Sequence, residues 1–142
     1  MSEAALRGAA RLPGALRFTV LHACASKANS RRLVRGRHGL MSIKSPAALA
    51  FVAAAARQIP TLPVPLDGPV ALWARLVYGS HRPDLDEALV MDALQGRLIK
   101  NDRQIVEKHI WKAVDPRCPR VEGIVVPVQP ALSDLSSWSA RR

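Results

Sequence analysis

The segment VALWARLVY, residues 70–78, constrains the fold of this chain more than any other stretch. It is apolar nearly throughout, and a strand of that kind belongs in the middle of a sheet, where other elements cover it. A Pro-rich connection, residues 60–69, precedes it, and the turn-forming residues GSHRP follow it. We therefore expect residues 70–78 to form the central strand of a sheet.

The patterns of the neighbouring segments predict which elements surround this strand. The expected helices are residues 45–59 and 86–95, and the expected strands are 16–23, a hairpin at 33–43, 104–113 and 121–128. Strands and helices in this order predict an α/β (α+β) fold, in which a single mixed β-sheet is flanked by two helices.

Cap and turn residues mark the ends of several elements. Ser45 followed by a proline is typical of a helix start, so we expect the first helix to begin there. Asp86 is expected to cap the second helix, and Gly96 is expected to end it. Gly36 and Gly39 bracket the turn of the hairpin.

The length of 142 residues suits one folded domain with a real core. We expect that domain to span residues 17–128. Residues 1–16 contain Ala, Leu and Arg without a compact apolar region, and we expect a flexible N-terminal extension there. Residues 129–142 are expected to form a polar C-terminal tail.

Basic residues dominate the first part of the chain. The net charge is +10, and residues 1–60 contain ten Lys or Arg but one acidic residue. This asymmetry is typical of a surface that binds a polyanion, although it also fits a basic surface that is merely soluble. Together with the acidic motif described next, it predicts DNA phosphate contacts from Lys27, Asn29, Arg31, Arg32, Arg35, Arg37 and Lys44, with Ser30 as a further hydrogen-bonding group.

Acidic residues gather in one later segment. Six of the eleven fall within the 24 positions from Asp84 to Glu107. Asp84 and Asp86 share a face if the chain there is extended. The residues between Asp86 and Asp102 are enough for a helix and for the chain to return, so Asp102 could lie beside the first two carboxylates. Three such carboxylates are ligands suited to Mg²⁺, which would offset their mutual repulsion. From spacing alone a structural interpretation is favoured, with Asp86 as a cap, Asp92 as a solvated helix residue and Asp102 in a turn.

The combination of motifs is more specific than its parts. RPDLD, then DAL, then NDRQIVE, preceded by SKANSRR in a basic N-terminal half, resembles the RusA family of Holliday junction resolvases, in a divergent, phage-type form. The resemblance extends from about residue 17 to residue 128. It implies a homodimeric endonuclease of DNA recombination and repair that cuts four-way DNA junctions by paired nicks with Mg²⁺.

By this resemblance, Asp84, Asp86 and Asp102 would be the catalytic, metal-binding aspartates, and Asp92 would support the site. There are four departures from the family pattern. Glu87 replaces an Asn, Asn101 replaces the first Asp of a pair, and the helix segment between Asp86 and Asp92 looks two residues shorter. The helix lysine of the family is also absent, with Val90 or Ala88 in its place. Lys100 and Lys108 are candidates to supply that charge from another element.

Two other functions remain open on the sequence alone. The first is a non-catalytic DNA-binding protein that keeps the resolvase fold, which the absent helix lysine favours. The second is a basic RNA-associated protein, although no segment resembles an RNA-recognition motif. Metal-dependent nicking of branched DNA separates the resolvase from both.

The cysteines and the apolar runs bear on the setting of the protein. Cys24 and Cys118 have no metal-binding spacing, so we expect small buried hydrophobic residues in a reducing, intracellular setting. The resemblance implies the cytoplasm of a bacterial or phage-infected cell. The longest apolar run, residues 46–56, is too short for a membrane span.

Overall fold

The computed structural model of the chain describes residues 2–26 and 31–128. Its main sheet has four strands in the order β1-β6-β4-β5. The central strand β4 pairs with β5 in parallel and with β6 antiparallel, so the sheet is mixed, as expected. The strands are β1 (Leu16–Val20), β4 (Val70–Tyr78), β5 (Ile105–Val114) and β6 (Arg120–Pro127).

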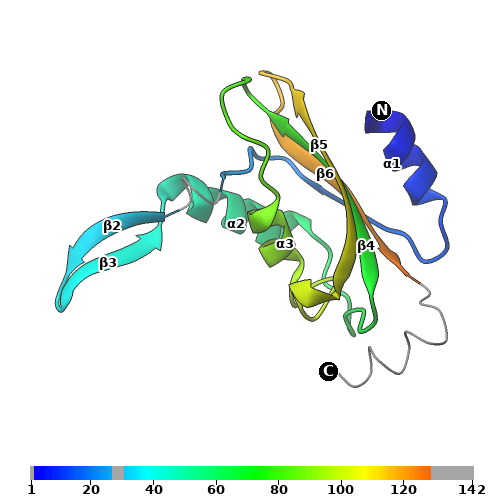
Figure 1. Cartoon of the computed structure of the whole chain (residues 1–142), viewed down its shortest axis with the longest axis horizontal. Coiled ribbons are helices and arrows are strands. Elements are labelled where there is room, and N and C mark those ends of the chain that lie inside the picture. The colour runs from blue at the N-terminus through cyan, green and yellow to red at the C-terminus, as the bar shows by residue number, and fades with distance from the viewer. Residues whose placement is uncertain (1, 27–30, 129–142) are drawn as a thin grey trace.

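Two helices, α2 (Pro46–Gln58) and α3 (Ala88–Leu94), cover one face of this sheet (Figure 1). The hydroxyl of Ser45 accepts the backbone N–H of Ala48 at 3.2 Å, which confirms the predicted start of α2. Phe51 of α2 is completely buried, and it belongs to the same core as Leu72 and Leu76 of β4. The apolar faces of both helices are therefore buried against the sheet.

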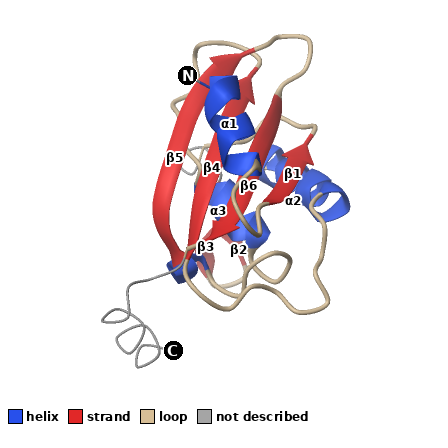
Figure 2. Ribbon diagram, turned by 90° about the vertical axis from the view of Figure 1, so that its right-hand side faces the viewer, coloured by secondary structure: helices blue, strands red, loops and turns tan. Residues whose placement is uncertain are grey.

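A third helix, α1 (Ser2–Ala10), lies across the opposite face, in front of β4 and β6 in Figure 2. Leu6 and Ala9 of α1 are buried against Ile124 and Val126 of β6. We expected a flexible extension over residues 1–16, and the structure differs there. The helix is short and rich in alanine, and Leu6 and Ala9 on its inner side face an apolar patch that exists only once the sheet has formed.

A buried ion pair lies under α1. The Arg75 guanidinium donates to both carboxylate oxygens of Glu122, at 3.1 and 2.8 Å, and to Glu3 of α1 at 3.4 Å. Burial alone would raise the pKa of Glu122, but hydrogen bonds from Arg120 and Arg75 lower it below its usual range. The pair therefore joins β4, β6 and α1 through one buried positive charge.

The predicted hairpin forms but does not join the main sheet. Strands β2 (Arg31–Gly36) and β3 (Gly39–Lys44) pair only with each other in a separate two-stranded sheet. This hairpin, which we name the arm, projects away from the body of the molecule (Figure 1). Gly39 has a φ of +111°, a conformation that side-chain-bearing residues rarely adopt, so the turn depends on it.

The structure corrects the predicted start of the second helix. We expected Asp86 at the N-cap, but α3 begins at Ala88 and its N-cap position is Glu87. Asp86 still accepts a hydrogen bond at this helix start, from the backbone N–H of Ala88 at 2.9 Å. Gly96 follows the helix with a φ of +78°, which confirms it as the stop.

Candidate functional site

The segment from Gly79 to Glu87, which we name the acidic loop, connects β4 to α3 and carries Asp84 and Asp86. Its backbone is tied to the last residue of β4. The buried Tyr78 hydroxyl donates to the carbonyl of Asp84 and accepts from the backbone N–H of Asp86, both at 3.2 Å. One phenol therefore fixes the backbone on both sides of Leu85.

A lysine from β5 ties down the earlier part of the acidic loop. The Lys112 ammonium donates to the carbonyl of His81 at 2.9 Å and to that of Pro83. It also lies 5.6 Å from the centroid of the Tyr78 ring, within the range of a cation–π contact. Tyr78 and Lys112 thus lie together at the paired ends of β4 and β5 and form one clamp on the loop.

Lys108 lies four residues before Lys112 on the same face of β5. Its ammonium contacts the Glu87 carboxylate at 2.8 Å. Lys100, the other lysine considered as a substitute for the helix lysine, contacts Asp67 at 3.6 Å instead. Of the two, Lys108 is the one whose charge reaches the end of the acidic loop.

Asp102 is held by a different device. It begins the 3₁₀ turn η1 (Asp102–Gln104), which Asn101 caps by accepting the backbone N–H of Arg103 at 2.9 Å. The buried Gln104 amide donates to two carbonyls of the chain before β4 and accepts from two backbone N–H groups, all at 2.8 Å. Asn101 therefore has a structural role at the position where the resemblance led us to note a missing aspartate.

The three aspartates do not form a closed metal site. Asp84 is exposed, Asp86 is partly buried on the same loop, and Asp102 is partly buried on η1, which contacts α3. Among the described residues, no three His, Cys, Asp or Glu side chains lie together as metal ligands would. Asp92 is exposed on α3. The carboxylates have the right chemistry for Mg²⁺, but in this structure their positions do not fit a complete site.

Burial raises the pKa values of two titratable groups behind the acidic loop. It raises the pKa of Tyr78 to about 12, so the clamping phenol keeps its proton at physiological pH. Burial, with added repulsion from Asp86 and Glu87, also raises the pKa of Cys24 to about 12. A neutral buried thiol is a poor nucleophile, which agrees with the expected packing role of Cys24; Cys118 is also free and partly buried.

His109 lies away from the acidic loop. Its ring stacks on Trp73 with 4.4 Å between centroids, and its Nε2 lies 2.6 Å from the Glu107 carboxylate. Trp73 packs with the cluster under α1. Because alternate residues of a strand face opposite sides of a sheet, His109 and Lys108 are separated by the sheet itself.

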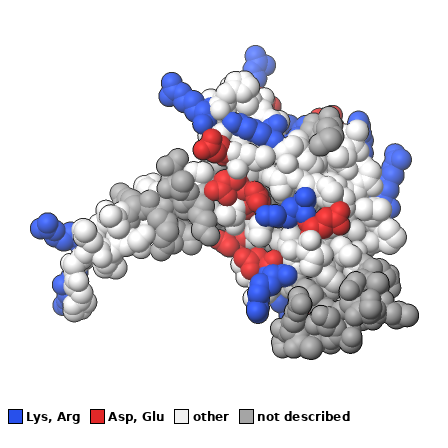
Figure 3. Space-filling model, viewed as in Figure 1, with Lys and Arg blue, Asp and Glu red and all other residues white. Residues whose placement is uncertain are grey.

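Of the residues predicted to contact DNA, Arg31, Arg32, Arg35, Arg37 and Lys44 belong to the arm. Arg35 and Arg37 are exposed there. Figure 3 shows Lys and Arg on the arm without Asp or Glu, whereas Asp and Glu gather on the adjacent face, over the acidic loop and α3. Lys27, Asn29 and Ser30, and the side chains of Arg31, Arg32 and Lys44, lie outside the described residues.

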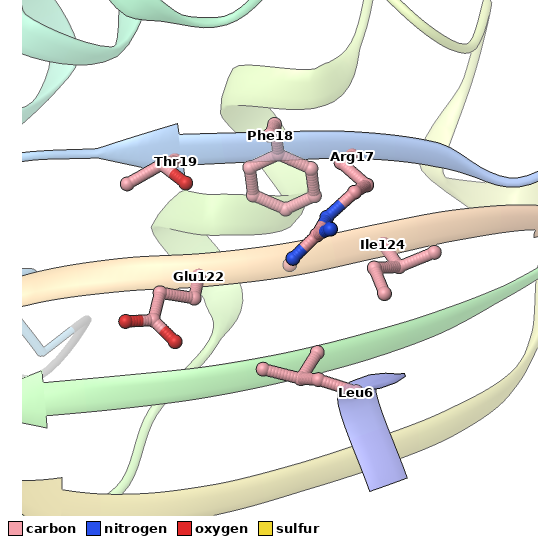
Figure 4. Close-up of a pocket in the computed structure, with 7 residues that line it drawn as sticks. Leu6, Arg17, Phe18, Thr19, Glu122 and Ile124 are labelled. Atoms are coloured by element: carbon pink, nitrogen blue, oxygen red, sulfur yellow. The ribbon is translucent and has the colours of Figure 1, made fainter. Parts of the chain in front are cut away.

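A pocket of about 260 Å³ opens on the α1 side of the sheet (Figure 4). Leu6 of α1, Arg17 and Thr19 of β1, and Glu122 and Ile124 of β6 line it. The acidic loop rests on the other side, where Tyr78 belongs to the core beneath α2 and α3. This pocket is therefore separate from the carboxylates.

The sequence model of the family described as Endodeoxyribonuclease RusA matches residues 25–125. The chain belongs to the RusA endodeoxyribonuclease family. RusA enzymes are Holliday junction resolvases that act on branched DNA and generally depend on a divalent metal, so membership identifies the class of enzyme. A search of the curated proteins gave no match. No helix in the described part of the chain is long and apolar enough to cross a membrane.

Sequence reasoning missed the two residues that hold the acidic loop. Tyr78 is the last residue of the apolar strand predicted at 70–78, and Lys112 is one of two lysines in the strand predicted at 104–113. A signal was present: the single tyrosine of the chain ends a buried strand directly before a loop rich in carboxylates. A buried hydroxyl in that position needs hydrogen-bond partners, and the loop backbone supplies them.

Proposed function

We propose that this chain resolves Holliday junctions by paired nicks, with Mg²⁺ as the metal and Asp84, Asp86 and Asp102 as its ligands. Asp92 supports the site from α3. The observation that carries the proposal is the clamp, because Tyr78 and Lys112 fix the backbone of an exposed acidic loop beside a cationic arm. Four hydrogen bonds to the loop backbone hold its carboxylates in fixed positions, as metal ligands require.

The chain's own residues account for substrate binding. Arg35 and Arg37 of the arm would draw DNA phosphates toward the acidic loop, since such contacts position DNA without reading its sequence. Arg31, Arg32 and Lys44 at the base of the arm, and Lys27 and Asn29, which precede it in the sequence, are proposed to extend this phosphate contact. Because the three aspartates are not assembled into one cluster among the described residues, this geometry defines no metal-centred step.

We further propose a homodimer as the active form. Two nicks on opposite strands of a junction need two sites related by a two-fold axis, and a homodimer supplies that symmetry. Sedimentation equilibrium of the free protein and of its junction complex would establish the number of copies.

The test is cutting of a labelled four-way junction beside a linear duplex of the same sequence, with Mg²⁺ or with a chelator. Asp84→Asn and Asp102→Asn should each lower cutting more than about a hundredfold, beyond the loss typical of outer-shell partners, while junction binding persists. Glu107→Gln is the matched control, since this exposed carboxylate contacts His109 on the other side of the sheet. Full cutting by either asparagine variant would refute the assignment.

A second candidate is supported by one observation. The three aspartates are not assembled into one cluster among the described residues, which suits a protein that binds junctions without cutting them. Tight junction binding with no metal-dependent nicks would establish this non-catalytic function.

A further inference from the structure

The arm has one open apolar face. The register of β2 and β3 places Leu33 opposite Ser42 and Arg35 opposite Leu40. These four side chains therefore share one side of the arm, which we name the leucine face. Leu33 is 69% exposed and Leu40 is 72% exposed, so both apolar side chains are exposed to solvent. The Arg35 side chain lies between them.

On the other face of the arm, one apolar side chain packs against the arm's own backbone. A Cβ on Gly36 would lie 2.1 Å from the sulfur of Met41, so the methionine packs directly over this glycine. Val34, opposite Met41, is partly buried. Met41 is still 49% exposed, but the two side chains of the leucine face are exposed further, at 69% and 72%.

The arm has few other contacts to hold it. Its two strands contact each other, and no other described helix or strand packs extensively against them. An isolated two-stranded hairpin is at best marginally stable in water. Two exposed leucines on such an element make it a docking surface, because burial against a partner would stabilise both the arm and the complex.

The charge of the arm selects the partner. Arg35 lies between the two leucines, Arg37 lies in the turn, and no Asp or Glu occurs from residue 4 to residue 66. Two arms packed through their leucine faces would bring arginine against arginine, which opposes pairing with a second copy. A polyanion with apolar surface suits both kinds of side chain, and nucleic acid has both phosphates and base faces.

The exposed leucines favour branched DNA over a linear duplex as the partner of the arm. In a linear duplex the base faces are stacked, so a groove-bound ribbon meets mainly base edges and phosphates. At a branch point the stacking is interrupted, and apolar side chains can pack against base faces as wedges do. Resting on the proposed function, we propose that the leucine face packs at the branch point of a four-way junction, with Leu33 and Leu40 against bases and Arg35 and Arg37 on the flanking phosphates.

The test compares the double variant Leu33→Ser/Leu40→Ser with Arg35→Ala/Arg37→Ala and with the control Val64→Ser, whose side chain is 74% exposed outside the arm. Binding to a four-way junction and to a linear duplex is measured in chelator by fluorescence anisotropy. The leucine variant should lose roughly tenfold or more in junction affinity while keeping its duplex affinity, because a buried leucine is worth about that factor. The arginine variant should weaken both complexes and reduce the salt slope by about one per arginine.

A fluorescent adenine analogue at the branch point adds a direct readout. Wild type and Val64→Ser should change its emission on binding, and the leucine variant should not. Equal junction binding and equal emission for wild type and the leucine variant would overturn the proposal. A change in the sedimentation mass of the leucine variant would also overturn it, in favour of a second copy on this face. If wild type itself shows no preference for the junction over the duplex, the proposed function fails as well.

Discussion

The arm and the acidic loop are both surface segments next to each other in the fold, but they are held in opposite ways. The arm is a regular hairpin with its own ladder of hydrogen bonds and little packing against the body. The acidic loop has no regular structure, yet Tyr78 and Lys112 bind four of its backbone groups. Regular structure and firm attachment are therefore separate properties in this molecule.

The difference suits two tasks on one substrate. A segment that follows the shape of branched DNA benefits from freedom relative to the body. A segment that presents carboxylates to one phosphate benefits from fixed positions, because small displacements of catalytic groups lower rates strongly. Changes in the body and the loop should therefore affect stability and cutting, whereas changes on the arm should affect binding.

The largest effect on stability should come from the ion pair beneath α1. Glu122→Gln removes the negative charge that pairs with the buried Arg75 at 2.8 Å and leaves it the 3.4 Å ion pair to Glu3, and losing one charge of a buried pair costs about 3 kcal/mol of unfolding free energy. Leu33→Ser on the arm should change that free energy by less than about 0.5 kcal/mol. Urea unfolding of both variants measures the contrast, and equal losses would show that the arm belongs to the cooperative core.

A smaller effect, on rate, should come from Tyr78→Phe. The ring stays buried but both hydrogen bonds to the acidic loop are lost, so we expect kcat for junction cutting to fall about tenfold. KM and junction affinity should not change, since the arm is untouched. Lys112→Met should act in the same direction, and Lys112→Arg, which keeps a cationic donor, should recover part of the rate. An unchanged kcat for Tyr78→Phe would remove the clamp from the mechanism.

The smallest expected effect is the pH dependence of stability that comes from the ionisation of Tyr78. Tyr78 is the single tyrosine of the chain, so the ultraviolet absorbance of tyrosinate reports its ionisation alone. Burial raises the pKa of Tyr78 to about 12 in the folded protein, against about 10 in the unfolded chain. Its contribution to stability should be complete below pH ~10 and should disappear as pH rises through about 12. A titration midpoint near 10 in the folded protein would mean that the phenol is open to water.

Much of the fold follows from the sequence. The apolar run of residues 70–78 places β4 at the centre of the sheet, and Ser45, Gly39 and Gly96 mark the ends of their elements. Local chemistry decides these features, so a single sequence reveals them. Helix α1 does not follow in the same way, because its burial depends on Ile124 and Val126, far along the chain.

The candidate site is less accessible to such reasoning. The sequence identifies Asp84, Asp86 and Asp102 as chemically suited, and their role as ligands stays a proposal. Their spacing does not reveal that Asp84 and Asp86 share one clamped loop while Asp102 lies on η1. That depends on how η1 and the loop pack around α3, which is a long-range property. For the same reason the sequence does not show that His109 faces the opposite side of the sheet.

The pairing of β1 with β6 has a consequence for where this domain begins. The family match starts at residue 25, but β1 (Leu16–Val20) lies before that point and forms one edge of the four-stranded sheet by pairing with β6. A fragment cut to the matched residues would leave β6 with an unpaired row of backbone donors and acceptors, next to apolar side chains that α1 had covered. Bare strand edges of this kind recruit other chains. We therefore expect such a fragment to self-associate more readily than a chain with α1 and β1, and the family match covers less than one complete folding unit.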